Sequence, residues 1–256
     1  MLIVVNMAER FLFVPLLGFV IILVDIIFKY LKTHIAIIIN IFICIVFCLM
    51  TFEQNKVWKT NLSLFEYGTK ISPYSTRTQV GLGGELYRLS RIEKDQNKKL
   101  ELINSSIKPL KKSIEIYPEN INAQHYLSCV YLDKNKLDSS LIYLIKLQEL
   151  QKGHEDGLYN LRVLAWQALN QNKLNTAEEA AYNLLKTDSL KFDYIELMAA
   201  VKVNQGSLFE AIKYMEELLI IQPQNKKIIK NLIMANRDVG QNDQVLKYEK
   251  LFNTLK

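Results

Sequence analysis

Apolar and polar positions divide the chain into two unlike parts. From Phe11 to Phe52 apolar residues form almost uninterrupted runs, whereas from Glu53 onward they alternate with polar and charged residues. The first part contains two runs, residues 11–30 and 35–52. At about 1.5 Å per residue, each run is long enough to cross a hydrocarbon core of about 30 Å. Because the segment between them is short, the pattern predicts an antiparallel hairpin of two membrane-spanning helices.

The basic residues that flank the runs bear on the orientation of this hairpin, which we place in residues 1–52. Lys29 and Lys32 lie in the turn, against three basic residues on the opposite side. Basic residues are enriched in the cytoplasmic segments of membrane proteins. The count alone does not decide, but the turn has the denser charge. This favours a cytoplasmic turn, an integral membrane protein and a C-terminal part that lies outside the cytoplasm.

A few side chains inside the runs carry chemistry. An ionisable residue within a span invites a functional hypothesis, but Asp25 lies one helical turn before Lys29 and is expected to pair with it. Cys44 and Cys48 lie four residues apart on an apolar helix, and Cys129 lies far from both. We expect these thiols to serve packing, since the pattern supports neither a disulfide framework nor a metal site.

From Glu53 onward the spacing of apolar residues changes. Residues 53–74 predict an amphipathic linker with a short helix, and residues 75–256 contain a repeat. Within the repeat part, the charged residues 91–99 are expected to form a loop or a frayed helix. Residues that tolerate left-handed backbone recur at intervals of 37, 34 and 34 positions, at Asn135, Asn172, Gly206 and Gly240. An apolar residue precedes each of them by eight positions, and a mostly small residue follows by five: Leu127, Leu164, Met198 and Leu232; Ser140, Ala177, Ala211 and Val245.

This spacing resembles that of tetratricopeptide repeats, in which each unit is a pair of antiparallel helices. Proline after Tyr117 and after Gln222 is typical of the end of such a pair. Single pairs cannot bury their apolar faces, so consecutive pairs stack into a solenoid with a concave groove. A generic helical bundle is the alternative, although bundles have no fixed period. We therefore predict an all-α fold, with a solenoid that binds a protein or peptide through the first helices of its repeats.

Composition and charge exclude several other functions. The formal net charge is +6, but basic and acidic residues are interspersed, so nucleic acid is not an expected partner. His34, His125 and His154 fit no nucleophile arrangement, and the adjacent side chains of residues 153–157 are not expected to converge on a metal. Residues 81–84 are glycine-rich but lack the flanking features of a phosphate loop. We predict no catalytic residue, no metal ligand and no cofactor.

The segment before the first run is the most informative short motif. It runs Ala8-Glu9-Arg10-Phe11 at the membrane boundary, followed by apolar residues with Pro15 and Gly18. Arg10 could bind a lipid phosphate through two parallel hydrogen bonds, with Glu9 holding it in place. The alternative is ordinary anchoring, in which arginine extends to the interface.

This segment resembles a stretch near the end of the membrane part of one family, the GT-C type glycosyltransferases that carry C-terminal tetratricopeptide repeats. These are the transmembrane-and-TPR O-mannosyltransferases and their bacterial relatives. The matching residues are Ala8, Glu9, Arg10, Leu12, Pro15, Gly18 and Phe19, with departures at Phe13 and Leu16. After the hairpin, the passage into the repeats also matches, at Trp58, Leu64, Phe65, Ile71, Ser72, Pro73, Leu82 and Gly83.

The resemblance implies a polyprenyl-phosphate sugar as donor and repeats on the extracytoplasmic side. The family's general base is an acidic residue in a loop after its first span, and the family has many more than two spans. Neither feature is present in this sequence. The chain then corresponds to the C-terminal part of such an enzyme, as a fragment, a subunit or a relative reduced to a membrane-anchored binding module.

We expect no sugar transfer by this chain alone, because it lacks the loop carboxylate and most of the spans. The measurement is transfer from a polyprenyl-phosphate sugar to protein by the purified 256-residue chain. Transfer above the level of a heated sample would contradict this expectation.

Overall fold

The computed structural model describes residues 13–255, and within them the chain folds into thirteen α-helices and no strands. The chain divides into two compact units, Met1–Leu64 and Phe65–Lys256. The all-α fold predicted from the sequence is therefore confirmed. The two units are described separately below.

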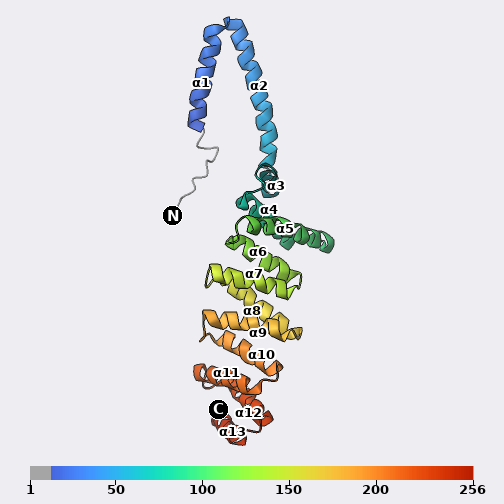
Figure 1. Ribbon diagram of the computed structural model, residues 1–256, viewed down its shortest axis with the longest axis vertical. Helices are drawn as coiled ribbons and strands as arrows, with labels where there is room; N and C mark the ends of the chain where they lie inside the picture. The colour runs from blue at the N-terminus through green and yellow to red at the C-terminus, as the bar shows by residue number, and fades with distance from the viewer. Residues whose placement is uncertain (1–12, 256) are drawn as a thin grey trace. The chain divides into compact units, whose positions relative to one another are not determined.

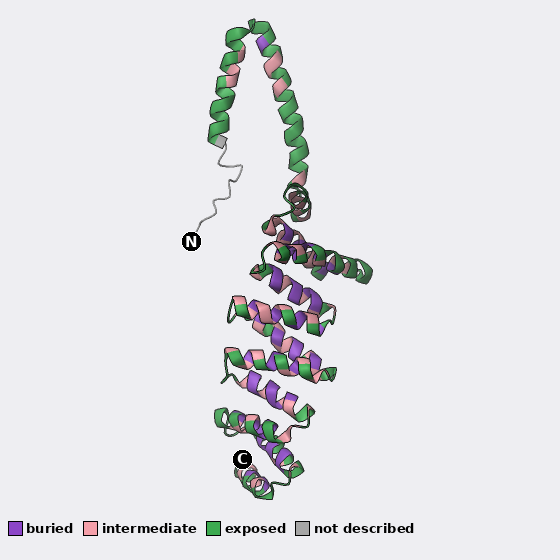
Figure 2. Cartoon of the chain, viewed as in Figure 1, coloured by how far each residue is buried: buried purple, intermediate pink, exposed green. Residues whose placement is uncertain are grey.

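The first unit contains α1 (Phe13–Tyr30) and α2 (Thr33–Val57), which contact each other. Their residues are almost all exposed, as the green ribbons in Figure 2 show. Within the described residues, α2 has the length and apolar composition needed to cross a membrane, with a mean hydropathy of 2.9. The first predicted span begins at residue 11, outside the described residues. A membrane hairpin with two spans therefore stays a prediction.

The α2 helix is longer than the apolar run that predicted it. It continues through four polar residues, where Lys56 forms an ion pair of 2.6 Å with Glu53 one turn earlier. Such pairs support a helix at its exposed end. The short helix expected in the linker is α3 (Asn61–Ile71). It begins where it does because Thr60 and Ser63 cap it reciprocally, each side-chain oxygen accepting from the other residue's backbone N–H at 3.0 and 3.1 Å.

The second unit is a solenoid of five helix pairs stacked in sequence order, as Figure 1 shows. In each pair a short turn joins two antiparallel helices. The pairs are α4 (Thr76–Ile92) with α5 (Gln96–Ile116), α6 (Ile121–Asp133) with α7 (Leu137–Leu150), α8 (Glu155–Asn170) with α9 (Leu174–Thr187), α10 (Phe192–Asn204) with α11 (Leu208–Ile221), and α12 (Lys226–Asp238) with α13 (Asn242–Thr254).

The turns within the last four pairs have one common geometry. The four residues predicted to tolerate left-handed backbone adopt it, with φ of 55° at Asn135, 57° at Asn172, 77° at Gly206 and 76° at Gly240. In each turn the following residue's N–H donates to the carbonyl five residues earlier, for example Lys136 to Tyr131 at 2.9 Å. This pattern is the Schellman motif, which satisfies carbonyls at the end of a helix. The predicted turns are confirmed.

Small residues allow the paired helices to approach closely. Ser140 on α7 is fully buried, and its hydroxyl donates to the backbone carbonyl of Ser128 on α6 at 2.8 Å. All eight apolar and small repeat positions named from the sequence are buried: Leu127, Leu164, Met198, Leu232, Ser140, Ala177, Ala211 and Val245. The purple stripe along the solenoid in Figure 2 marks this interior.

The first pair departs from what the sequence predicted. Residues 91–99 were expected to form a charged loop or a frayed helix, but α4 continues to Ile92 and α5 begins at Gln96. The reason is a helix cap: the carboxylate of Asp95 accepts from the N–H groups of Asn97 and Lys98 at 2.8 and 3.1 Å. Lysine is also a good helix former, so the segment is helical on both sides of the short break at residues 93–95.

The glycines of α4 allow other elements to pack tightly against this helix. A Cβ on Gly83 would lie 2.4 Å from Leu110 on α5, and one on Gly84 would lie 2.8 Å from Tyr126 on α6. Glycine weakens a helix by up to about 1 kcal/mol relative to alanine. In α4 this cost is offset by the close contact of α4 with α5 and α6.

We predict that Gly83→Ala destabilises the solenoid although alanine is the better helix former. Overpacking against Leu110 should cost about 1–3 kcal/mol, more than the gain in helix propensity. The measurement is urea unfolding of the full chain in detergent, followed by far-ultraviolet circular dichroism.

The matched control for this prediction is the double variant of Gly83→Ala with Leu110→Ala. Since the shortened side chain makes room for the new methyl group, the double variant should lose less stability than the sum of the two single variants. Strictly additive losses would show that the two residues do not compete for this space.

Candidate functional site

The candidate site is the face formed by the first helices of the pairs. Neighbouring first helices contact each other, α4 with α6, α6 with α8, and α8 with α10. Two hollows lie on this face. One is lined by residues of α4, α6 and α8 and the turns that follow α6 and α8. The other is lined mainly by residues of α10 and α12, with three residues of α11 and Trp166 of α8. Both hollows lie on the face where the repeat pattern predicted a binding groove, which is called the groove below.

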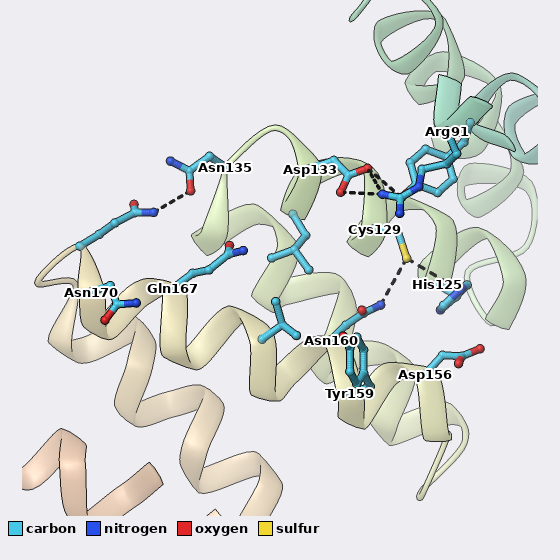
Figure 3. A pocket seen from close by; sticks show the side chains of 14 residues that line it. Arg91, His125, Cys129, Asp133, Asn135, Asp156, Tyr159, Asn160, Gln167 and Asn170 are labelled. Atoms are coloured by element: carbon cyan, nitrogen blue, oxygen red, sulfur yellow. Dashed lines mark hydrogen bonds and ion pairs between the residues drawn. The ribbon is translucent and has the colours of Figure 1, made fainter. Parts of the chain in front are cut away.

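The N-terminal hollow has a volume of about 900 Å³ and a largely polar lining. Asp133, the last residue of α6, accepts a hydrogen bond of 2.9 Å from the hydroxyl of Tyr87 and forms an ion pair of 3.1 Å with Arg91. Figure 3 shows Arg91 reaching from α4 to Asp133. These contacts fix one end of the hollow and connect the first two helix pairs.

The floor of this hollow holds a histidine and a cysteine. His125 and Cys129 lie one turn apart on α6, with Sγ 3.8 Å from Nε2, and Asn160 on α8 donates to Sγ at 3.3 Å (Figure 3). The Nδ1 atom of His125 is buried without a partner. The ring of His154 lies 5.3 Å away, centroid to centroid.

Burial sets the protonation of these groups. It lowers the pKa of His125, and the neighbouring His154 lowers it further. Burial raises the pKa of the Cys129 thiol and, with the nearby charge of Asp133, that of the Tyr87 hydroxyl. At neutral pH the cysteine is therefore a thiol, which is a poor nucleophile.

The loop that was weighed as a metal site has a structural role. His154 is the N-cap of α8, and its Nδ1 accepts from the N–H of Gly157 at 3.2 Å. Among residues 13–255, no group of three or more His, Cys, Asp or Glu side chains has an arrangement that could hold a metal ion. In this part of the chain the groove can bind through hydrogen bonds, charges and apolar contacts.

The C-terminal hollow is smaller, about 480 Å³, and more apolar. Three large side chains in it are exposed to solvent, Trp166 to 37%, Val203 to 40% and Met234 to 54%. Ala199 and Ala200 also line this hollow, and their small side chains fill little of it. An ion pair of 3.1 Å joins Lys227 and Glu196 at its edge. Large exposed apolar side chains in a hollow are typical of binding sites.

Two rows of residues follow the groove, each at a fixed distance from the left-handed turn residue. The position six before the turn is apolar or weakly polar in four consecutive pairs: Cys129, Trp166, Ala200 and Met234. The position two before the turn is an exposed carboxylate or amide: Asp133, Asn170, Asn204 and Asp238. All eight residues line one of the two hollows. Sequence reasoning missed these rows, although counting back from the four turns would have found them.

The structure describes some of the residues that the sequence analysis singled out, but not all of them. Glu9 and Arg10, the candidate lipid-phosphate ligands, lie outside the described residues, so their role stays a prediction. Asp25 and Lys29 are part of α1 but form no ion pair with each other, and the amine of Lys29 lies 5.8 Å from the ring centroid of Tyr30. The thiols of Cys44 and Cys48 are exposed on α2.

Comparisons with known proteins give structural similarity only. No protein-family model matches the chain, and no curated protein matches it. Among solved structures, the chain is similar to YrrB, described as "a TPR protein with an unusual peptide-binding site", at 11% identity and a TM-score of 0.47, covering 75% of this chain and 92% of YrrB. It is also similar to MamA at 19% identity and a TM-score of 0.43, covering 64% of this chain and 95% of that one. A further MamA structure, from AMB-1, has 14% identity and a TM-score of 0.47, with 71% and 93% covered.

Proposed function

We propose that the solenoid binds an extended segment of a partner protein along its groove. The observation that carries the proposal is the pair of rows on the first helices. Four consecutive pairs place an exposed amide or carboxylate at one position, and three of them place an exposed or half-exposed apolar side chain one turn earlier. An extended polypeptide can contact equivalent positions on several helix pairs at once, whereas a small molecule would occupy only one hollow.

The chemistry of the two rows suits a peptide. Carboxylates accept hydrogen bonds from backbone N–H groups, and asparagine amides both donate and accept, so Asn170 and Asn204 can bond a peptide backbone without regard to its side chains. The apolar hollow around Trp166 can receive one large side chain of the segment. Tryptophan is among the residues that contribute most to binding energy at protein interfaces.

Binding can be tested with the protein's own fluorescence. The chain has two tryptophans, Trp58 and Trp166. In the Trp58→Phe variant, emission reports on the C-terminal hollow alone. Peptides of about 12 residues, selected from a displayed random library on the full chain in detergent, should shift the emission of Trp166 to shorter wavelength, because a bound side chain would exclude water from the ring.

A matched pair of substitutions checks that the groove is responsible. Met234→Asn places a polar side chain in the hollow and should weaken binding of the selected peptides about tenfold, or about 1.4 kcal/mol. Ile220→Asn, at a side chain exposed to 78% on α11 outside both hollows, should leave binding unchanged. Equal effects of the two substitutions, or selected peptides that leave Trp166 unchanged, would contradict the proposed function.

Membrane anchoring through α2 is a further part of this proposal. The helix is 25 residues long, its mean hydropathy is 2.9, and only 6% of its most apolar stretch is buried. Exposing so many apolar side chains to water is costly, whereas lipid would cover them. The charge of the predicted turn favours an orientation with the solenoid outside the cytoplasm.

We expect the chain to stay in the membrane pellet after alkaline carbonate extraction. Protease added to intact cells should remove an epitope tag placed after Lys256 and spare a cytoplasmic marker protein. Release by carbonate would contradict the anchor, and a protected tag would contradict the orientation while leaving the anchor in place.

The sequence motifs at residues 6–19 and 58–83 support one finer proposal. In it, the chain is the C-terminal part of a lipid-linked sugar transferase, and the groove holds the acceptor protein near the membrane. We expect the isolated chain to transfer no sugar. That result would agree both with this role and with a separate binding module.

A further inference from the structure

The charge of the groove differs in sign from that of the whole chain. The chain has a formal net charge of +6. Each hollow, in contrast, is lined by one basic residue and two carboxylates: Arg91 with Asp133 and Asp156 in the first, and Lys227 with Glu196 and Asp238 in the second. His125 adds no charge at neutral pH, because its pKa is lowered by burial. Each hollow therefore carries a net negative charge.

The basic residues of both hollows are already engaged. Arg91 forms an ion pair of 3.1 Å with Asp133, and Lys227 forms one of 3.1 Å with Glu196. On α8, which contributes to both hollows, Arg162 is likewise paired, with Asp193 at 2.6 Å. An acidic ligand would therefore compete with these carboxylates for the cations.

Of the four carboxylates that line the hollows, Asp156 and Asp238 have no ion pair or side-chain hydrogen bond among the described residues. Asp156 lies in the first turn of α8, where the helix dipole favours a negative charge without neutralising it. Asp238 is the last residue of α12, where the dipole is unfavourable to a carboxylate. Both are exposed and line a hollow. Each is therefore free to bind a cation from a partner.

The two carboxylates lie in different hollows, and the apolar side chains share the hollow of Asp238. Trp166 is on α8, Val203 on α10 and Met234 on α12, and all three are exposed within the C-terminal hollow. Asp156 is thus in the N-terminal hollow, on one side of the apolar side chains, and Asp238 is within the C-terminal hollow at the last residue of α12.

We propose that the groove is selective for an extended protein segment that carries basic side chains on both sides of a large apolar side chain. This inference rests on the proposed function and specifies the chemistry of the partner. The apolar side chain would enter the hollow of Trp166, and lysine or arginine side chains would pair with Asp156 and Asp238. An extended segment of about 12 residues, at about 3.3 Å per residue, reaches across several helix pairs.

The test uses two fluorescein-labelled peptides with the same Leu-Phe-Leu core in a Gly/Ser background. One has two lysines near each end and the other has two glutamates there. Binding to the full chain in non-ionic detergent is followed by fluorescence anisotropy. Because the chain as a whole is positive, non-specific attraction would favour the glutamate peptide. We expect the lysine peptide to bind at least tenfold more tightly.

Substitutions then assign this preference to the two carboxylates. Asp156→Asn and Asp238→Asn should each weaken binding of the lysine peptide about two- to fivefold, the range of an exposed ion pair. The double variant should also lose most of the dependence of binding on salt. Glu217→Gln removes an exposed carboxylate from α11, outside both hollows, and should have no effect.

The outcomes separate this inference from the proposed function. If both peptides bind equally, or the glutamate peptide binds better, and Met234→Asn weakens binding in either case, then the groove binds peptides but the basic preference is wrong. If the lysine peptide binds but the two Asp→Asn variants bind it as wild type does, the assignment to these carboxylates is wrong. If Met234→Asn has no effect on any peptide, both proposals fail.

Discussion

The structure depends on the fact that no helix pair can bury its apolar face alone. Each pair presents apolar side chains toward the pair before it and the pair after it, so the interior is shared between neighbours. One buried cluster extends from α7 to α10 and a second from α10 to α13, with α10 contributing to both. A third joins α5 and α6 to half-buried side chains of α4. Removal of one pair would therefore expose apolar surface on two others.

This sharing also explains why the groove is free to hold binding chemistry. The buried positions of the first helices, such as Leu127 and Leu164, are fixed by packing, whereas the positions two and six before each turn line the hollows and are exposed or half-buried. Their side chains differ from pair to pair, with Cys129 and Trp166 at equivalent places. The solenoid thus separates residues that maintain the fold from residues that can select a partner.

The period of the repeats was predictable from the sequence because backbone geometry determines it. A turn with φ between 55° and 77° favours glycine or asparagine, and a close helix contact requires a small side chain, so Gly206 and Ser140 could be placed from the sequence. Residues 91–99 were assigned wrongly because a charged segment resembles a loop until its cap at Asp95 is recognised. The two hollows could not be predicted, since the shape of each depends on how side chains from several different helices pack.

The contacts of the fold join residues that are close in sequence, and this affects how the chain folds during synthesis. In the described part of the chain, each helix contacts only helices one or two places away in the sequence. The side-chain hydrogen bond with the greatest sequence separation, from Tyr87 to Asp133, joins residues 46 positions apart. Folding that relies on such local contacts is fast and needs no distant segment. A pair that leaves the ribosome can therefore dock on the pair completed just before it, so that the order of synthesis is also the order of assembly.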